Sequence, residues 1–153
     1  MRKNQGITLI SLIITLIVMS IIATITVATI KKDNNTVKET KSSMKLYELQ
    51  QIQQIVLENY VKYMQTKNED YLVGTKCTSL SQLNQYENEL NIQFKDTAGE
   101  GYKNYYYLDS DDALSALEIT GTKDRYLVNY KTGEVLNYTE KKTSTGEVLY
   151  ISN

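Results

Sequence analysis

The residues with the clearest chemical meaning lie at the start of the chain, where a glycine precedes a long apolar run. Gly6 and Ile7 are followed by Thr8-Leu9-Ile10, and the basic residues Arg2 and Lys3 stand before them. A small residue beside an apolar run is a candidate site for peptide-bond hydrolysis by a separate peptidase. The Gly6–Ile7 bond precedes the run, so cleavage there leaves the run in the mature chain.

Side chains for catalysis are scarce in the rest of the sequence. The chain has no histidine, which is the commonest general base and metal ligand. Cys77 is the single cysteine, and a lone cysteine is more often a small buried residue than a nucleophile. Neither a phosphate-binding glycine loop nor a nucleophile elbow is present. We therefore expect no enzymatic activity and no cofactor.

A short acidic stretch is the remaining candidate for metal chemistry. Asp109, Asp111, Asp112 and Glu118 offer oxygens of the kind that Ca²⁺ prefers, but they lack the spacing and the glycine of an EF-hand loop. Ser110 precedes two of these acids, as expected where a helix is capped by serine and its first turn carries acids. We therefore predict a capped helical turn with solvated carboxylates and no metal site, with a Ca²⁺ site as the alternative.

The apolar run is long enough to cross a membrane. Ile7–Ile30 carries no charge, and as a helix it would measure about 36 Å, against about 30 Å for the hydrocarbon core of a bilayer. Its threonines, Thr15 among them, are expected to donate hydrogen bonds to carbonyls of the preceding turn, with bonds between neighbouring helices as the alternative.

Four kinds of membrane-directed segment could account for the apolar run, and three of them explain its features less well than the fourth. A secretory signal peptide has a shorter apolar region followed by its cleavage site. A lipoprotein signal would need a cysteine at the end of the run, where the chain has none. An uncleaved anchor leaves Gly6 without a role. A leader that is cut before the apolar run accounts for both features.

The segment Lys3–Leu12, with the sequence KNQGITLISL, resembles the N-terminus of type IV pilins and pseudopilins in its Gly-Ile-Thr-Leu-Ile form. The resemblance covers roughly the first thirty residues. It implies that a prepilin peptidase in the membrane cuts after Gly6 and that Ile7 becomes an N-methylated N-terminus. It also implies that the apolar helix is stored in the membrane and then drawn into the core of a helical filament. The start of this assembly helix comprises Thr8, Leu9, Ile10, Ser11 and Leu12.

Ser11 departs from the pattern of that family. The family usually carries a glutamate at this position, which is thought to meet the charged N-terminus of a neighbouring subunit. A serine hydroxyl can accept a hydrogen bond from that amine, but the contact is weaker than an ion pair. The proline that many major pilins carry in this helix is also missing, since the chain has none. We therefore expect assembly to rest on helix packing.

Charge gives little information on topology and more on partners. Arg2 and Lys3 favour a cytoplasmic N-terminus, whereas Lys31 and Lys32 counted alone favour the reverse. The resemblance favours an external C-terminal domain, hence a single-pass membrane protein that reaches the cell surface or a pilus. The 17 basic and 18 acidic residues give no basic excess, so we predict no nucleic-acid partner.

The sequence after the apolar run predicts a continuation of the helix. Between Thr36 and Gln65, apolar residues recur at spacings of three and four, as one buried helix face requires. We predict a helix from Thr8 to Gln65, with Asp33–Thr36 as a candidate break. The predicted stripe comprises Leu49, Ile52, Ile55, Val56, Tyr60, Tyr63 and Met64, with Val37 and Met44 extending it less regularly.

Residues 66–153 predict a small α+β domain. Ser79 caps a short helix running toward Leu90, and a loop near Asp96–Gly101 leads to a strand over Asn104–Leu108. The three tyrosines in this strand must alternate between its two faces. Arg125–Tyr130 and Glu134–Tyr138 form a hairpin around Gly133, and its Thr-Gly-Glu-Val-Leu motif recurs from Thr145.

The predicted organisation is therefore a leader (1–6), an apolar transmembrane and assembly helix (7–30), its amphipathic continuation (31–65) and an α+β domain (66–153). This long helix packed on a small antiparallel sheet is a pilin-like plan. The expected function is a structural subunit that self-associates into a type IV pilus-like or pseudopilus filament, with other pilins and an assembly machine as partners. The alternatives are a monomeric membrane-anchored binding module at the cell surface, and a minor or tip pseudopilin of a secretion or DNA-uptake machine.

Overall fold

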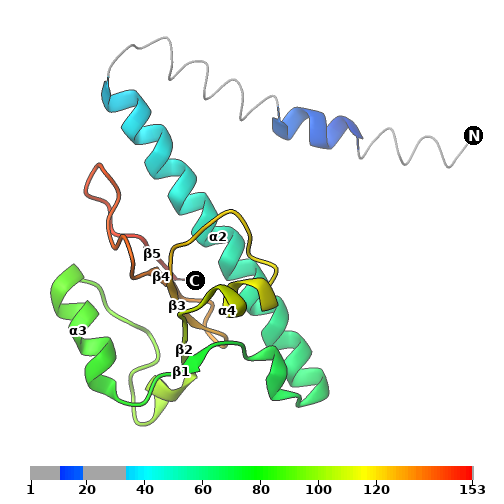
Figure 1. The fold of residues 1–153 in the computed structure, drawn as a ribbon, viewed down its shortest axis with the longest axis vertical. Coiled ribbons are helices and arrows are strands. Elements are labelled where there is room, and N and C mark those ends of the chain that lie inside the picture. The colour runs from blue at the N-terminus through cyan, green and yellow to red at the C-terminus, as the bar shows by residue number, and fades with distance from the viewer. Residues whose placement is uncertain (1–10, 19–33, 153) are drawn as a thin grey trace, which may run out of the picture. The chain divides into compact units, whose positions relative to one another are not determined.

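A computed structural model describes residues 11–18 and 34–152 of the chain (Figure 1). The chain divides into two compact units, Met1–Lys41 and Ser42–Asn153. In the first unit, residues 11–18 are helical. None of the helices in the described ranges combines the length and the apolar composition that a membrane span needs. Most of the predicted span lies outside those ranges.

Helix α2, Asn34–Thr66, confirms the predicted amphipathic helix and ends one residue beyond its expected end. Leu49, Ile52 and Val56 are its buried core residues, each at most 2% exposed. The helix stops where Lys67 takes a positive φ of 54° and donates its backbone N–H to the carbonyl of Tyr63. A left-handed residue at this point ends the run of helical hydrogen bonds.

The stripe predicted on α2 is right at its centre and wrong at its ends. Ile55, Tyr60 and Tyr63 are half-buried, whereas Met44 and Met64 are 65% and 46% exposed. Met44 lies five positions before Leu49, which turns it about 140° around the helix from Leu49. Met64 lies in the last turn of α2.

The sheet has five antiparallel strands in the order β1-β2-β3-β4-β5, so every strand pairs with its neighbours in sequence. In the β3–β4 hairpin, Val128 pairs with Val135. The predicted strand near residue 105 and the predicted hairpin are confirmed, and strand β1 was not predicted. The strands are β1 (Thr75–Lys76), β2 (Tyr105–Leu108), β3 (Tyr126–Asn129), β4 (Val135–Asn137) and β5 (Tyr150–Ile151).

The repeated motif forms turns at both of its copies but strands of different length. Gly133 and Gly146 both take positive φ values, of 76° and 90°. Asn129 closes the first turn, because its side-chain oxygen accepts from the backbone N–H groups of Lys131 and Thr132. In the second copy only β5 joins the sheet, and Val148 makes a single bridge to Lys142.

Four short helices complete the domain. Serines cap two of them, as predicted. Ser79 and Gln82 form a capping box at the start of α3, and the Ser110 hydroxyl accepts from the backbone N–H of Ala113 at the start of α4. The short helices are η1 (Glu69–Tyr71), α3 (Leu80–Leu90), η2 (Gly101–Asn104) and α4 (Asp111–Ala116).

The sheet has an apolar core on each face. On one face, Leu49, Ile52 and Val56 of α2 pack with the α4 segment and with Val128 and Val135. On the other, the core comprises α3 residues, Phe94 and the opposite sides of the same strands, including Leu127 and Leu136. The domain therefore has three layers, with α2 and α3 on opposite faces of the sheet, as Figure 1 shows.

The tyrosines of β2 confirm the predicted alternation. Tyr105 and Tyr107 pack with the α3 core and Tyr106 with the α2 core. The α+β class and the antiparallel sheet are thus as predicted. A continuous helix from Thr8 and the boundaries at residues 6 and 30 remain predictions, because the residues that decide them lie outside the described ranges. The break at Asp33–Thr36 also remains a prediction, because Asp33 lies outside those ranges and the three residues after it begin α2. The boundary at residue 65 lies within α2, one residue before its end.

Candidate functional site

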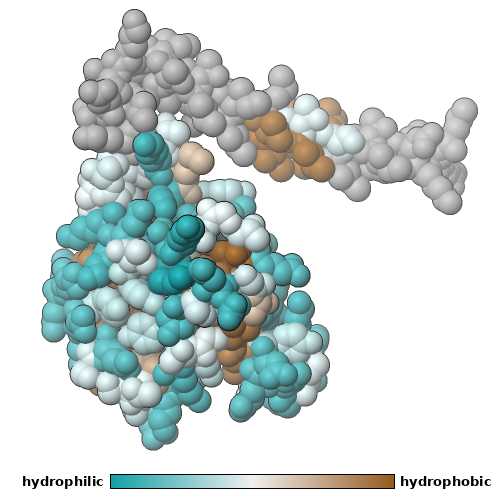
Figure 2. Space-filling model, viewed as in Figure 1, coloured by the Kyte–Doolittle hydropathy of each residue, from teal (hydrophilic) through white to brown (hydrophobic). Residues whose placement is uncertain are grey.

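Residues 11–18, the described part of the predicted assembly helix, present apolar side chains around most of the helix. Leu12 and Leu16 are 55% and 56% exposed, and the intervening isoleucines are exposed to a similar degree. Figure 2 shows this segment in brown, whereas the visible face of the domain is mostly teal and white. A helix without a polar face requires an apolar environment such as lipid or a bundle of like helices.

The polar side chains of this segment are uncharged. The Thr15 hydroxyl donates to the carbonyl of Ser11 at 2.6 Å, which confirms the back-bonding expected for this threonine. The hydroxyl is thereby satisfied within the helix, so it adds little cost in an apolar environment. Ser11 and Leu12 are the predicted site residues within the described ranges. Gly6, Ile7, Thr8, Leu9 and Ile10 lie outside them.

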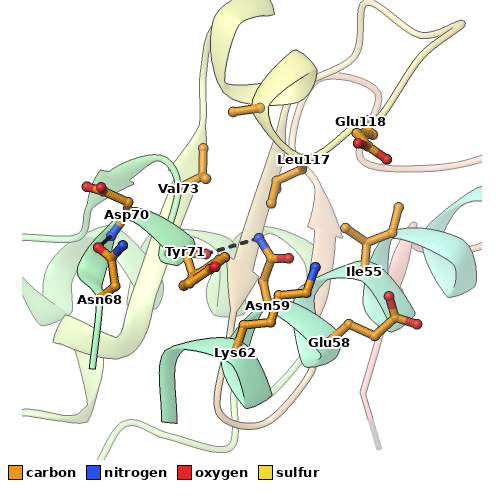
Figure 3. A pocket seen from close by; sticks show the side chains of 11 residues that line it. Ile55, Glu58, Asn59, Lys62, Asn68, Asp70, Tyr71, Val73, Leu117 and Glu118 are labelled. Atoms are coloured by element: carbon orange, nitrogen blue, oxygen red, sulfur yellow. Dashed lines mark hydrogen bonds between the residues drawn. The ribbon is translucent and has the colours of Figure 1, made fainter. Parts of the chain in front are cut away.

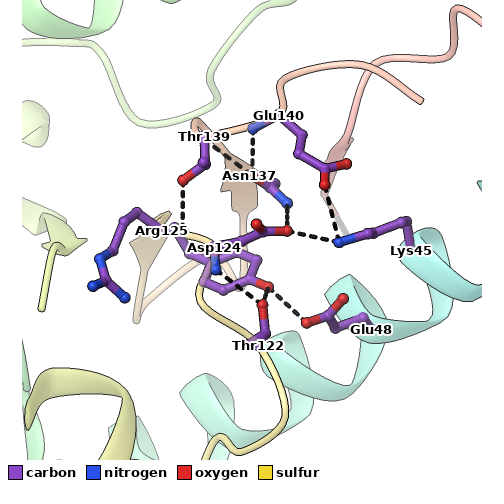
Figure 4. A network of polar contacts seen from close by, with 9 residues as sticks. Lys45, Glu48, Thr122, Asp124, Arg125, Asn137, Thr139 and Glu140 are labelled. Carbon is purple, nitrogen blue, oxygen red and sulfur yellow. Dashed lines mark hydrogen bonds and ion pairs between the residues drawn. The ribbon is translucent and has the colours of Figure 1, made fainter. Parts of the chain in front are cut away.

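A polar cluster joins the first turns of α2 in the second unit to the sheet loops (Figure 4). Lys45 Nζ contacts Asp124 Oδ2 at 2.8 Å and Glu140 Oε1 at 3.2 Å, and Asn137 Nδ2 donates to the same Asp124 oxygen at 3.0 Å. Burial by itself lowers the pKa of Lys45, but the hydrogen bonds and charges of the two carboxylates outweigh burial and raise that pKa overall.

Two further contacts extend this cluster along α2. The Tyr126 hydroxyl donates to Glu48 Oε1 at 2.7 Å, and the hydroxyls of Ser42 and Thr145 lie 3.2 Å apart. Ser42, Lys45 and Glu48 recur at a spacing of three, so they share one side of α2. These three polar side chains extend the buried apolar side of α2 toward the start of the helix. The spacing was visible in the sequence, but the loops that they contact were not.

Among the residues whose burial the structure describes, the most buried charged one is Glu134, which is 1% exposed. Its Oε1 accepts from the hydroxyls of Tyr105 at 2.7 Å and Thr132 at 2.6 Å. Its Oε2 accepts from the Tyr150 hydroxyl at 2.6 Å and from the backbone N–H of Lys95 at 3.1 Å. Four donors thus hold the carboxylate in place of a cationic side chain, and they connect β2, β5 and the loop after α3. The sequence indicated only a strand residue here.

A groove of about 490 Å³ lies at the end of α2, between η1 and the segment after α4 (Figure 3). Apolar residues, including Ile55 of α2 and Leu117, contribute to its lining. Lys62 Nζ lies 6.0 Å from the ring centroid of Tyr71. The other charged lining residues are acidic and exposed: Glu58, Asp70 and Glu118.

Two of the four acids considered for Ca²⁺ have separate structural partners. Asp109 accepts from the Thr75 hydroxyl at 3.0 Å, and Asp111 pairs with Arg125 at 3.0 Å. In the part of the chain that the structure describes, no three His, Cys, Asp or Glu residues converge on one point. The cap at Ser110 is confirmed.

Cys77 is buried, as the sequence indicated. It is 1% exposed, and its Sγ donates to Gln82 Oε1 at 3.1 Å. Burial raises the pKa of the thiol above its usual value, which disfavours the reactive thiolate.

Comparison with known families supports the interpretation of the N-terminus. Residues 1–27 match the family model of the prokaryotic N-terminal methylation motif, which is the leader signature of type IV pilins and pseudopilins. The resemblance seen in the sequence is thus confirmed for this segment. No curated protein and no solved structure matches the chain.

Proposed function

We propose that this chain is a structural subunit of a type IV pilus-like or pseudopilus filament. The methylation motif at residues 1–27 is the observation that carries the proposal. The uncharged helix at residues 11–18, with apolar side chains around most of it, supports it. A prepilin peptidase cleaves after Gly6, Ile7 becomes the methylated N-terminus, and the helix waits in the membrane.

Assembly then exchanges lipid contacts for contacts between like helices. Side chains such as Leu12 and Leu16 pack against neighbouring subunits in the filament core. Ser11 brings no carboxylate into that core, so the association rests on van der Waals packing and hydrogen bonds. The domain after α2 stays on the outside of the filament, on the external side of the membrane. The chain has a structural and not an enzymatic role.

The processing step is tested by mass spectrometry of the mature protein. The expected N-terminus is Ile7 carrying one methyl group on its amine, and a Gly6→Val variant is expected to retain Met1–Gly6 because the bulky side chain blocks the peptidase. A matched Gly99→Val variant should be cleaved like the natural protein. An intact leader on the natural protein would contradict the proposal.

The filament step is tested separately on material sheared from the cell surface. A filament subunit sediments with this fraction, whereas a monomeric anchored module stays with the membrane. Ser11 favours one second candidate, a minor or tip pseudopilin, because such a subunit does not need the repeated contact that the usual glutamate makes. That candidate predicts processing at Gly6 together with a low abundance in the sheared fraction.

A further inference from the structure

The polar cluster of Lys45, Asp124, Asn137 and Glu140 holds an amine and a carboxamide against one carboxylate oxygen. Asp124 Oδ2 accepts from Lys45 Nζ at 2.8 Å and from Asn137 Nδ2 at 3.0 Å, so Asp124 lies between the two side chains (Figure 4). Glu140 Oε1 lies 3.2 Å from the same lysine nitrogen. An amine nucleophile, a carboxamide and a carboxylate that can transfer protons are the groups needed to form an amide bond between two side chains.

The side-chain carbonyl of Asn137 is polarised for attack. Its Oδ1 accepts from two backbone N–H groups, those of Thr139 at 3.1 Å and Glu140 at 3.0 Å. Two donors on one carbonyl oxygen stabilise the negative charge that develops there when a nucleophile adds to the carbon, as an oxyanion hole does. Asn137 is 1% exposed and the Asp124 side chain is 15% exposed, so the fold largely excludes water from the amide carbon.

We propose that Lys45 and Asn137 form an amide bond within the folded chain, with Asp124 transferring the protons. The inference goes beyond the proposed filament function and does not depend on it. The Asp124 carboxylate takes a proton from the Lys45 ammonium, and the resulting amine attacks Cγ of Asn137 to form the new C–N bond.

The leaving group departs through the same carboxylate. Asp124 passes the first proton to Nδ2 of Asn137, the Cγ–Nδ2 bond breaks, and ammonia leaves. A second proton from the lysine nitrogen follows through Asp124, so that the products are one amide and one ammonium ion. No oxidation takes place and no co-reactant is consumed. The new bond joins α2 covalently to the end of β4.

The charge of Lys45 makes this reaction slow. Burial lowers the pKa of Lys45, but its contacts with Asp124 and Glu140 outweigh burial and raise that pKa overall. The neutral amine that attacks is therefore a minor form. Because the reaction takes place once in each molecule, a slow step is sufficient to complete it.

A second asparagine provides a comparison within the same domain. Asn129 also precedes a turn, and its Oδ1 accepts from the backbone N–H groups of Lys131 at 2.9 Å and Thr132 at 3.1 Å. Its Nδ2 donates to Asp96 Oδ2 at 3.2 Å. In the part of the chain that the structure describes, no salt bridge involves Asp96. Asn129 therefore has the turn and the carboxylate but no amine, and we expect its amide to stay unmodified.

Mass spectrometry of the full chain purified from the producing cells tests the bond. We expect the chain to be lighter, by one ammonia molecule, than its sequence requires. Trypsin should release a branched peptide in which residues 42–62 are joined to residues 132–141, because an amide at Lys45 prevents cleavage there. The peptide 126–131, which contains Asn129, should have its unmodified mass.

Three substitutions test the roles of the side chains. Lys45→Arg keeps the positive charge beside Asp124 but supplies no amine that can attack, and it should abolish the branched peptide. Asp124→Asn keeps the shape of the side chain but removes the proton acceptor, and it should also abolish the branched peptide. Lys141→Arg is the matched control, since Lys141 pairs with Glu89 at 2.8 Å, and it should leave the branched peptide unchanged.

The natural protein decides the proposal. An unmodified Asn137, including after prolonged incubation of the purified chain, would overturn it. Loss of ammonia without the branched peptide would overturn it as well, since a succinimide at an asparagine gives the same mass. Loss of water with Lys45 joined to Asp124 would mean that the carboxylate and not the amide is attacked. A branched peptide in Asp124→Asn would refute the role of that carboxylate. Sedimentation of sheared material tests the filament function independently of these results.

Discussion

At the scale of single residues, the domain depends on a carboxylate that has no cationic partner among the residues described. Glu134 is stabilised by three hydroxyls and one backbone N–H, all of them donors. A buried charge of this kind tolerates substitution poorly, because each donor loses its acceptor when the charge is removed. Its sequence position, directly after a turn glycine, gave no sign of this role, since its partners come from residues up to 39 positions away.

Replacing Glu134 by glutamine tests this arrangement. The glutamine amide presents N–H donors to groups that are donors already, so we expect the free energy of unfolding to fall by about 2–4 kcal/mol. Chemical denaturation of the detergent-solubilised chain measures the change. Glu147→Gln, at an exposed position, is the matched control and should be neutral. An equal effect of the two substitutions would contradict the role of Glu134.

Buried and half-buried tyrosines make the domain sensitive to alkali. Burial raises the pKa of the Tyr138 phenol to about 12, and it raises the pKa of five further tyrosines: Tyr105, Tyr107, Tyr126, Tyr130 and Tyr150. An unfolded tyrosine ionises near pH 10. Because the folded state holds these protons more tightly, the stability is fully present below about pH 10 and is lost as the pH rises above it.

We therefore expect Tm to fall steeply above about pH 10, with ultraviolet absorbance of phenolate appearing together with unfolding. The control is the exposed Tyr47: a Tyr47→Phe variant should keep the same pH dependence, whereas Tyr126→Phe should reduce it. Ionisation of most tyrosines well before unfolding would contradict the buried state of these rings.

At the scale of elements, α2 shows where periodicity is informative. The spacing of Leu49, Ile52 and Val56 predicted the buried face, because three- and four-residue steps place side chains on one side of a helix. The same rule misplaced Met44, which is apolar but out of phase. Helix caps at Ser79 and Ser110 and the hairpin at Gly133 were also predictable, since each depends on residues close in sequence. Strand β1 was not, because only its pairing with Tyr106 and Tyr107 makes it a strand.

Two substitutions in α2 distinguish the two faces. Ile52→Ala removes a side chain that is 2% exposed and should cost about 2–5 kcal/mol of unfolding free energy. Met44→Ala removes a side chain of similar size that is 65% exposed and should change the stability by less than about 0.5 kcal/mol. Thermal and denaturant unfolding of both variants measures the difference. Similar losses would mean that Met44 packs against the domain.

At the scale of the whole molecule, the chain joins a part that requires an apolar environment to a domain with its own two cores. Residues 11–18 expose apolar side chains, whereas the domain buries its own on both faces of the sheet. The sequence predicts a division after Ile30, because charge and hydropathy change sharply there, and this boundary remains a prediction. It did not predict the Lys45 cluster or the groove after α4, since both assemble from segments that are distant in sequence.

The proposed topology predicts the result of proteolysis on intact cells. Protease added from outside should degrade residues 40–153, since these lie on the external side, while a cytoplasmic marker protein stays intact. Immunodetection of the domain measures the loss. Complete protection of the domain in cells, with cleavage only after lysis, would reverse the topology.

The order of the strands has a consequence for how the domain folds. Because each strand pairs with its neighbour in sequence, the sheet can grow strand by strand as the chain emerges, and no strand waits for a pairing partner that is distant in sequence. The Glu134 carboxylate is the exception, since Tyr150 in the last strand supplies one of its four donors. The final strand thus completes the solvation of a buried charge that earlier strands have already enclosed.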